Sequence, residues 1–243
     1  TPAGIAAAIS AAKGECTVLL IEPTARIGGM ATSGLSHTDF HSFESLSGAF
    51  LEFARRVEAH YAKTYGPDSA QVRDSFRGTF GEPKVNLAIL EAMLAEHGAI
   101  TVRRGFRLGE LAVSRRDGGV AQIEAAAFTT GEGAPLLARA KVFVDATYEG
   151  DLMAQAGVTW RVGREGRAEF GESLAPEQPD GQLQAYNFRF IMTRDPANRI
   201  TPVVPPGYRP EDFAGMRIAL ASGRIKKIFD YPRDCVFKAQ TPP

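Results

Sequence analysis

The chain has 243 residues, which allows one large domain or about one and a half domains of ordinary size. Lys and Arg together number 28, as do Asp and Glu, so no net charge favours nucleic acid or an anionic membrane as a partner. No apolar run approaches the ~20 residues of a membrane-spanning helix, and two cysteines are too few for a disulfide-rich scaffold or a four-thiolate cluster. After these exclusions, the composition is typical of a globular enzyme, and we expect this enzyme in the cytoplasm.

The chain begins with a helical pattern, a strand pattern and a long loop. Residues 3–13 are rich in Ala and Ile and precede Gly14, which predicts a tightly packed helix with a glycine stop. The apolar run 17–22 predicts a buried parallel strand. Residues 23–39 are rich in Gly, Ser and Thr without a regular period, and predict a functional loop.

Two helices and a group of strands follow. Apolar residues at helical spacing predict a helix over residues 50–65 and another over residues 86–97. Residues 100–113 and 120–130 predict antiparallel strands, because apolar residues recur between turn signals. Residues 142–147 are apolar and end in small polar residues, which predicts one more buried strand.

The character of the sequence changes after about residue 160. Residues 163–181 are polar and glycine-rich, the alternation over 186–192 predicts a half-buried strand, and residues 211–222 predict a helix. We therefore predict an α/β domain over residues 1–160 and the start of a β-rich substrate domain over residues 161–243.

Gly4 and Glu22 have the spacing of a dinucleotide-binding unit. In such a unit, a glycine lets the first helix pack closely on the sheet, and the helix N-terminus faces a pyrophosphate. An acid about 20 residues later, at the end of the next strand, accepts hydrogen bonds from ribose hydroxyls. Gly4 alone would fit any Ala-rich helix, but together with Glu22 it favours a dinucleotide fold.

The segment after Glu22 favours a flavin over a nicotinamide. Residues 22–30 resemble the strand-end acid, basic residue and Gly-Gly pair of FAD proteins of the glutathione-reductase and fumarate-reductase type. Gly28 and Gly29, followed by Met30, would bring backbone N–H groups close to the phosphate and ribose, and Arg26 would neutralise phosphate charge. A flexible surface loop is the alternative interpretation.

A third candidate cofactor segment follows the predicted strand 142–147. Residues 145–152 resemble the Asp-Ala-Thr-Gly type of turn in such flavoproteins, and ligands bind outside the carboxyl ends of parallel strands. We expect Ala146 and Thr147 to lie beside the cofactor, with Asp151 near the start of a helix. An ordinary strand-to-helix turn, capped by Thr147 or Asp151, is the alternative.

These segments together resemble bacterial FAD-dependent oxidoreductases of the FAD_oxidored group, broadly related to the flavin subunit of heterodisulfide reductase. The resemblance covers nearly the whole chain and is most specific at residues 141–165 and 184–193. It implies bound FAD and a Rossmann-like, α/β FAD-binding domain of the glutathione-reductase type with an antiparallel meander. It also implies an FAD domain that extends beyond both ends of this sequence. We predict no metal site, because Cys16 and Cys235 lack the close spacing of cluster ligands.

Candidates for catalysis and substrate binding lie outside the cofactor motifs. His37 is the natural acid–base residue at neutral pH, and Asp39 could orient it or bind substrate. Asn187 and Arg189 share the polar face of the predicted strand 186–192 and could contact a polyol, sugar or carboxylate. The alternative for His37 and Asp39 is that they only hydrogen-bond to the backbone of their loop. The alternative for Asn187 and Arg189 is that their strand face is simply solvated.

We therefore predict an FAD-dependent oxidoreductase that transfers hydride between the flavin and a small organic substrate. The alternatives are an electron-transfer subunit and an incomplete, non-catalytic flavoprotein fragment. The composition does not predict an oligomeric state.

Overall fold

The α/β part of the fold is built on a two-stranded parallel sheet. In the computed structural model, which describes residues 1–35, 38–115, 121–183 and 196–225, β1 (Val18–Glu22) pairs with β2 (Ile100–Arg104). The register aligns Val18 with Ile100 and Glu22 with Arg104. The carboxyl ends of the two strands therefore lie at the same edge of the sheet.

Helix α1 (Pro2–Lys13) precedes β1 and packs against it, as its Ala-rich sequence predicts. Thr1 caps the helix, because its hydroxyl accepts a hydrogen bond from the Gly4 N–H at 3.2 Å. Ile5 and Ile9 lie one turn apart and are both buried, so this face of α1 enters the core.

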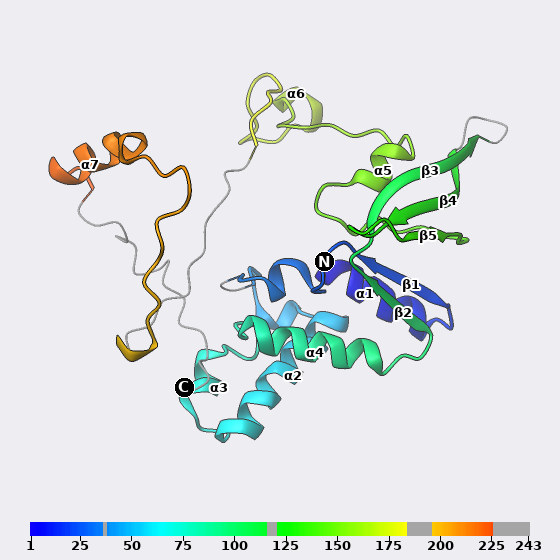
Figure 1. Cartoon of the computed structure of the whole chain (residues 1–243), viewed down its shortest axis with the longest axis horizontal. Coiled ribbons are helices and arrows are strands. Elements are labelled where there is room, and N and C mark those ends of the chain that lie inside the picture. Colours follow the sequence, from blue (N-terminus) through cyan, green and yellow to red (C-terminus); the bar gives the residue numbers. More distant parts are fainter. Residues whose placement is uncertain (36–37, 116–120, 184–195, 226–243) are drawn as a thin grey trace.

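The connection from β1 to β2 consists of helices (Figure 1). They are η1 (Gly29–Thr32), η2 (Phe43–Ser45), α2 (Gly48–Tyr65), α3 (Ala70–Asp74) and α4 (Pro83–Ala95). Val57 and Tyr61 of α2 and Leu90 and Met93 of α4 are buried with the apolar face of α1. The long helices predicted from periodicity are thus present, and they form one core with α1.

A second sheet follows the parallel pair. Strands β3 (Arg107–Arg115), β4 (Ala121–Thr129) and β5 (Pro135–Ala138) are antiparallel neighbours in chain order. The short helix α5 (Asp151–Gln155) packs against β3 (Figure 1). The chain then leads away from both sheets.

The later segments carry short helices. They are α6 (Arg167–Phe170), η3 (Pro196–Asn198), η4 (Pro210–Phe213) and α7 (Ala214–Ala221). α7 packs on η4, and both lie apart from the two sheets in Figure 1. The predicted strand 186–192 lies outside the described residues. Among the described residues beyond 160, the extended pairing consists of one isolated bridge, between Arg164 and Asp180.

One predicted strand is present but less buried than expected, and another is absent. β1 is not buried on both faces: Val18 and Leu20 pack against the core, whereas Leu19 on the other face is 42% exposed. Residues 142–147 form no strand, and Val142 and Val144 are 75% and 64% exposed. The physical reason is that a strand needs a backbone partner, and no described strand pairs with this segment.

No helix of the described residues is long and apolar enough to cross a membrane.

Candidate functional site

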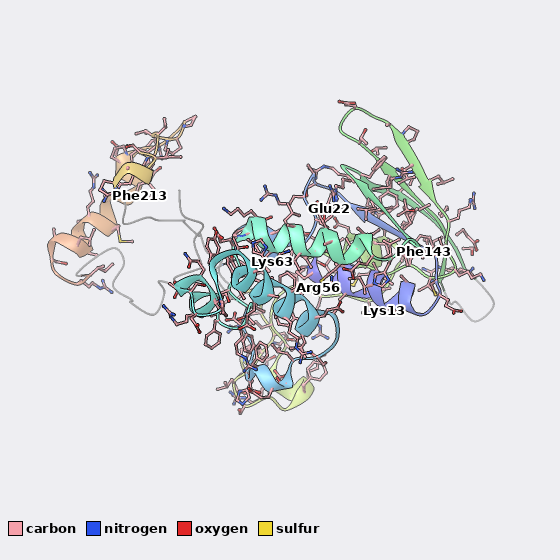
Figure 2. All side chains as sticks on the ribbon, turned by 90° about the horizontal axis from the view of Figure 1, so that it is seen from below. Lys13, Glu22, Arg56, Lys63, Phe143 and Phe213 are labelled. Atoms are coloured by element: carbon pink, nitrogen blue, oxygen red, sulfur yellow. The ribbon has the colours of Figure 1, made fainter. Side chains whose placement is uncertain are left out.

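Glu22 ends β1 at the edge of the sheet where the predicted cofactor loop begins (Figure 2). One carboxylate oxygen, Oε1, accepts hydrogen bonds from the Thr24 N–H at 2.9 Å and from the Thr24 hydroxyl at 2.8 Å. These bonds fix the orientation of the carboxylate. Within the described ranges no residue donates to Oε2, which remains an acceptor for a ligand hydroxyl.

The next residues form a tight turn around Gly28 and Gly29. Both glycines adopt positive φ, 94° and 52°, which favours glycine. The buried Thr32 holds the turn, since its hydroxyl donates to the Ile27 carbonyl at 2.5 Å and to the Gly29 carbonyl at 3.2 Å. A Cβ at Gly28 would lie 2.5 Å from Cγ2 of Thr32 and 3.0 Å from Cδ1 of Leu90. No other residue fits at this position without moving the turn.

Arg26 places a cation beside this turn. Its guanidinium donates to the Thr32 carbonyl at 3.0 Å, and the side chain is exposed. Across the part of the chain that the structure describes, Arg26 forms no ion pair. Its charge is therefore available to a phosphate.

Tyr148 joins the glycine turn to the loop after β5. The Met30 N–H donates to its hydroxyl at 2.9 Å, and a Cβ at Gly29 would lie only 2.4 Å from that oxygen. Tyr148 is not among the site residues predicted from the sequence. The two residues are 118 positions apart, so no spacing rule links them.

Asp145 organises the loop that carries Tyr148. Its Oδ1 accepts from the Thr147 N–H at 3.0 Å and the Thr147 hydroxyl at 2.7 Å, and its Oδ2 accepts from the Met153 N–H at 3.0 Å. Burial acts to raise the pKa of Asp145, but the hydrogen bonds from Thr147 and Met153 outweigh it and lower the pKa below its usual range. The carboxylate is thus a structural anchor of the loop.

The N-terminus of α1 meets the same loop. The Thr1 hydroxyl donates to the Ala146 carbonyl at 2.6 Å, and a Cβ at Gly4 would lie 3.0 Å from the Ala146 Cβ. Gly4 was predicted to let α1 pack closely on the sheet. The nearest neighbour of an added Cβ is instead Ala146 of this loop, and Cδ1 of Leu20 in β1 lies 3.9 Å away. The start of α1, the glycine turn and the loop 145–151 are brought together.

The remaining predicted site residues occupy different surroundings. Asp151 is the first residue of α5 and is exposed, as is Asp39. Met30 is 54% exposed, next to Tyr148. His37, Asn187 and Arg189 lie outside the described residues. In the described ranges, no group of three or more His, Cys, Asp or Glu could hold a metal ion.

This arrangement fits a dinucleotide better than a metal or a peptide. Glu22 offers an oriented carboxylate oxygen and Arg26 offers a cation, and the glycine turn between them and η1 is held by Thr32 and Tyr148. The N-terminus of α1 meets the same loop 145–151 as the glycine turn, and the N–H groups and dipole of a helix N-terminus favour an anion. The residues present thus match the chemistry of an adenosine and a pyrophosphate.

One comparison, with a family sequence model, agrees with this chemistry. The sequence model of the family described as "FAD dependent oxidoreductase" matches residues 1–237. The crystal structure of THI4 from Thermovibrio ammonificans is similar at a TM-score of 0.39 and 15% identity, over 73% of this chain and 72% of that one. No curated protein matches the chain.

Proposed function

The chain belongs to the family of FAD-dependent oxidoreductases, and from this premise we propose that it transfers hydride between FAD and a small organic substrate. Dependence on FAD and flavin-based redox activity follow from the family. The observation that supports cofactor binding at this site is the junction of the glycine turn with the loop 145–151, made by Tyr148 and Met30.

The proposed cofactor residues divide by the part of FAD that they would contact. Glu22 would accept hydrogen bonds from the adenosine ribose, and Arg26 would neutralise a phosphate. Backbone groups of the remaining positions would line the pyrophosphate and the flavin side; these positions are Gly4, Gly28, Gly29, Met30, Ala146, Thr147 and Asp151. We further propose a glutathione-reductase type of FAD domain over residues 1–160 and a substrate domain over residues 161–243.

FAD, when bound, supplies the two-electron acceptor or donor of the reaction. The protein must bind and orient the substrate, and must hold the proton that leaves or enters with the hydride. We propose His37 for the proton and Asp39 for its orientation. Asn187 and Arg189 are proposed to contact the substrate, and we place the enzyme in the cytoplasm.

Absorbance of the purified protein tests the proposal directly. We expect the visible bands of an oxidised flavin, release of FAD on denaturation, and bleaching when a substrate reduces it. Protein that is colourless and takes up no added FAD would contradict the proposal.

The proposed role of His37 has a separate test. His37→Ala is expected to slow flavin reduction by about 10²-fold or more, as loss of a general base does, while FAD stays bound. Stopped-flow absorbance measures the rate, and His60→Ala, on α2, is the matched control. Unchanged reduction in His37→Ala would remove His37 from the mechanism.

A further inference from the structure

Tyr148 occupies the Met30 N–H, one of the backbone donors that the glycine turn is expected to offer to a phosphate. The Met30 N–H donates to the Tyr148 hydroxyl at 2.9 Å, and this hydrogen bond is exposed to solvent. A Cβ at Gly29 would lie 2.4 Å from the hydroxyl oxygen and 3.1 Å from Cζ of the same ring. Tyr148 therefore covers this side of the turn, and a ligand that approaches here meets the phenol before it meets the backbone.

The Tyr148 hydroxyl can replace the donor that it occupies. A phenol has one O–H donor in addition to the lone pairs on its oxygen, and here the oxygen accepts from Met30. Within the described part of the chain, no residue accepts a hydrogen bond from this O–H. Tyr148 is 54% exposed, and a hydroxyl that already accepts a hydrogen bond is polarised toward donating one. The hydroxyl thus extends the donor of the turn from the backbone to a side chain.

Two positive features lie near this hydroxyl. Arg26 donates to the Thr32 carbonyl, and Thr32 follows Met30 by two residues in η1, which is ~4 Å along a helix of this type. The loop that carries Tyr148 also meets the N-terminus of α1 at Ala146. A cation, a helix N-terminus and a hydroxyl donor together favour an anion with several oxygens over a neutral group.

We infer that the Tyr148 hydroxyl donates a hydrogen bond to a phosphate oxygen of FAD and so acts as the donor on this side of the glycine turn. The ring positions the hydroxyl, because it packs where a Cβ at Gly29 would otherwise lie. The inference rests on the proposed function in that FAD is the ligand of this site. It adds a side chain to the backbone groups already assigned to the cofactor.

Tyr148→Phe tests the contact, since it removes the hydroxyl and keeps the ring against Gly29. Isothermal titration calorimetry on the apoprotein should give dissociation constants for FAD and for ADP about tenfold or more above those of the wild type. ADP carries a pyrophosphate without a flavin, so a phosphate contact is lost from both ligands. Tyr208→Phe is the matched control and should bind like the wild type, because Tyr208 is 47% exposed and stacks on Phe213.

Phosphorus NMR separates a direct contact from a purely structural role. At saturating FAD, Tyr148→Phe should shift at least one of the two phosphorus resonances of the bound cofactor, whereas Tyr208→Phe should leave both unchanged. Weaker binding with both resonances unshifted would mean that the hydroxyl only holds the turn, and would overturn the inference. A loss of affinity for FAD but not for ADP would place the hydroxyl at the flavin and would also overturn it.

Flavin uptake by the wild type separates this inference from the proposed function. A wild type that binds FAD and ADP no more tightly than Tyr148→Phe would overturn the inference and leave the proposed function in place. A wild type that takes up no FAD would contradict the proposed function, and the ADP titrations would still decide whether the hydroxyl contacts a phosphate. A wild type that binds neither ligand would overturn both.

Discussion

Gly29 and Tyr148 hold together two loops that the sequence separates widely. Gly29 adopts a φ of 52°, and a Cβ there would lie 2.4 Å from the Tyr148 hydroxyl oxygen. The same hydroxyl accepts from the Met30 N–H, so the contact fixes both the turn and the loop. A side chain at position 29 would displace one segment of the proposed FAD site.

Gly29→Ala is therefore expected to weaken FAD binding by at least about tenfold, measured by fluorescence titration of the apoprotein. Gly133→Ala is the matched control: its φ is 85°, but nothing lies within 4 Å of the added Cβ. Both variants bear a backbone cost of roughly 1–2 kcal/mol for a non-glycine residue in this region. If both lose FAD equally, strain rather than the Tyr148 contact is responsible.

Asp145 gives the site a predictable response to pH. Because its pKa is lowered in the folded protein, its contribution to stability is present above the unfolded value of about 3.9 and is lost as the pH falls through the folded value. Asp145→Asn should flatten the decrease in the free energy of unfolding below about pH 4. Urea denaturation across this range measures it, with Asp151→Asn as the control. Identical profiles for wild type and Asp145→Asn would contradict the anchoring role.

At the scale of elements, burial rather than ion pairing attaches α4 to the rest of the core. Leu94 of α4 is 5% exposed within the apolar cluster. Arg56, labelled on α2 in Figure 2, pairs with Glu96, just after α4, and with Glu52 on its own helix, but these side chains remain partly exposed. Exposed ion pairs typically contribute about 0–1 kcal/mol, whereas a buried leucine contributes several times more.

Leu94→Ala should thus lower the free energy of unfolding by about 2–5 kcal/mol, and Arg56→Ala by less than about 1 kcal/mol. Chemical denaturation of both variants measures the difference. Leu174→Ala, at a position that is 96% exposed, is the control for losing a leucine without losing burial. A larger effect of Arg56→Ala than of Leu94→Ala would contradict the conclusion that burial rather than ion pairing attaches α4 to the core.

Helices and strands with a strong hydrophobic period were predicted well. The predicted strand over residues 142–147, for which no described strand is a partner, was not. α1, β1, α2 and α4 lie where local spacing placed them, because helical and strand periods depend on which face is buried. Residues 142–147 have a strand-like sequence but form no strand. Strand formation depends on a neighbouring backbone, which local sequence does not encode.

For the molecule as a whole, FAD would connect parts that are otherwise joined by few polar contacts. The start of α1 meets the loop 145–151 through Thr1 and Ala146, and the glycine turn meets it through Met30 and Tyr148. A ligand that touches all three segments stabilises the folded state relative to the unfolded state.

Removal of FAD should consequently lower the melting temperature, and re-addition should restore it. At free FAD about 100-fold above its dissociation constant, the expected stabilisation is about 2.7 kcal/mol, or roughly 5–10 °C for a chain of this size. Differential scanning fluorimetry with increasing FAD measures the shift, and NAD at the same concentration is the control. An equal response to NAD would point away from selective FAD binding.

The sequence by itself determined the helix and strand order of the first part of the chain, the spacing of Gly4 and Glu22, and the turn at Gly28 and Gly29. These features follow from local periodicity and from the backbone conformations that glycine allows. Only the tertiary structure decided that Tyr148 meets Gly29 and that the Thr1 hydroxyl meets the Ala146 carbonyl. Such contacts join residues far apart in the chain, so they depend on how whole elements pack rather than on any local pattern.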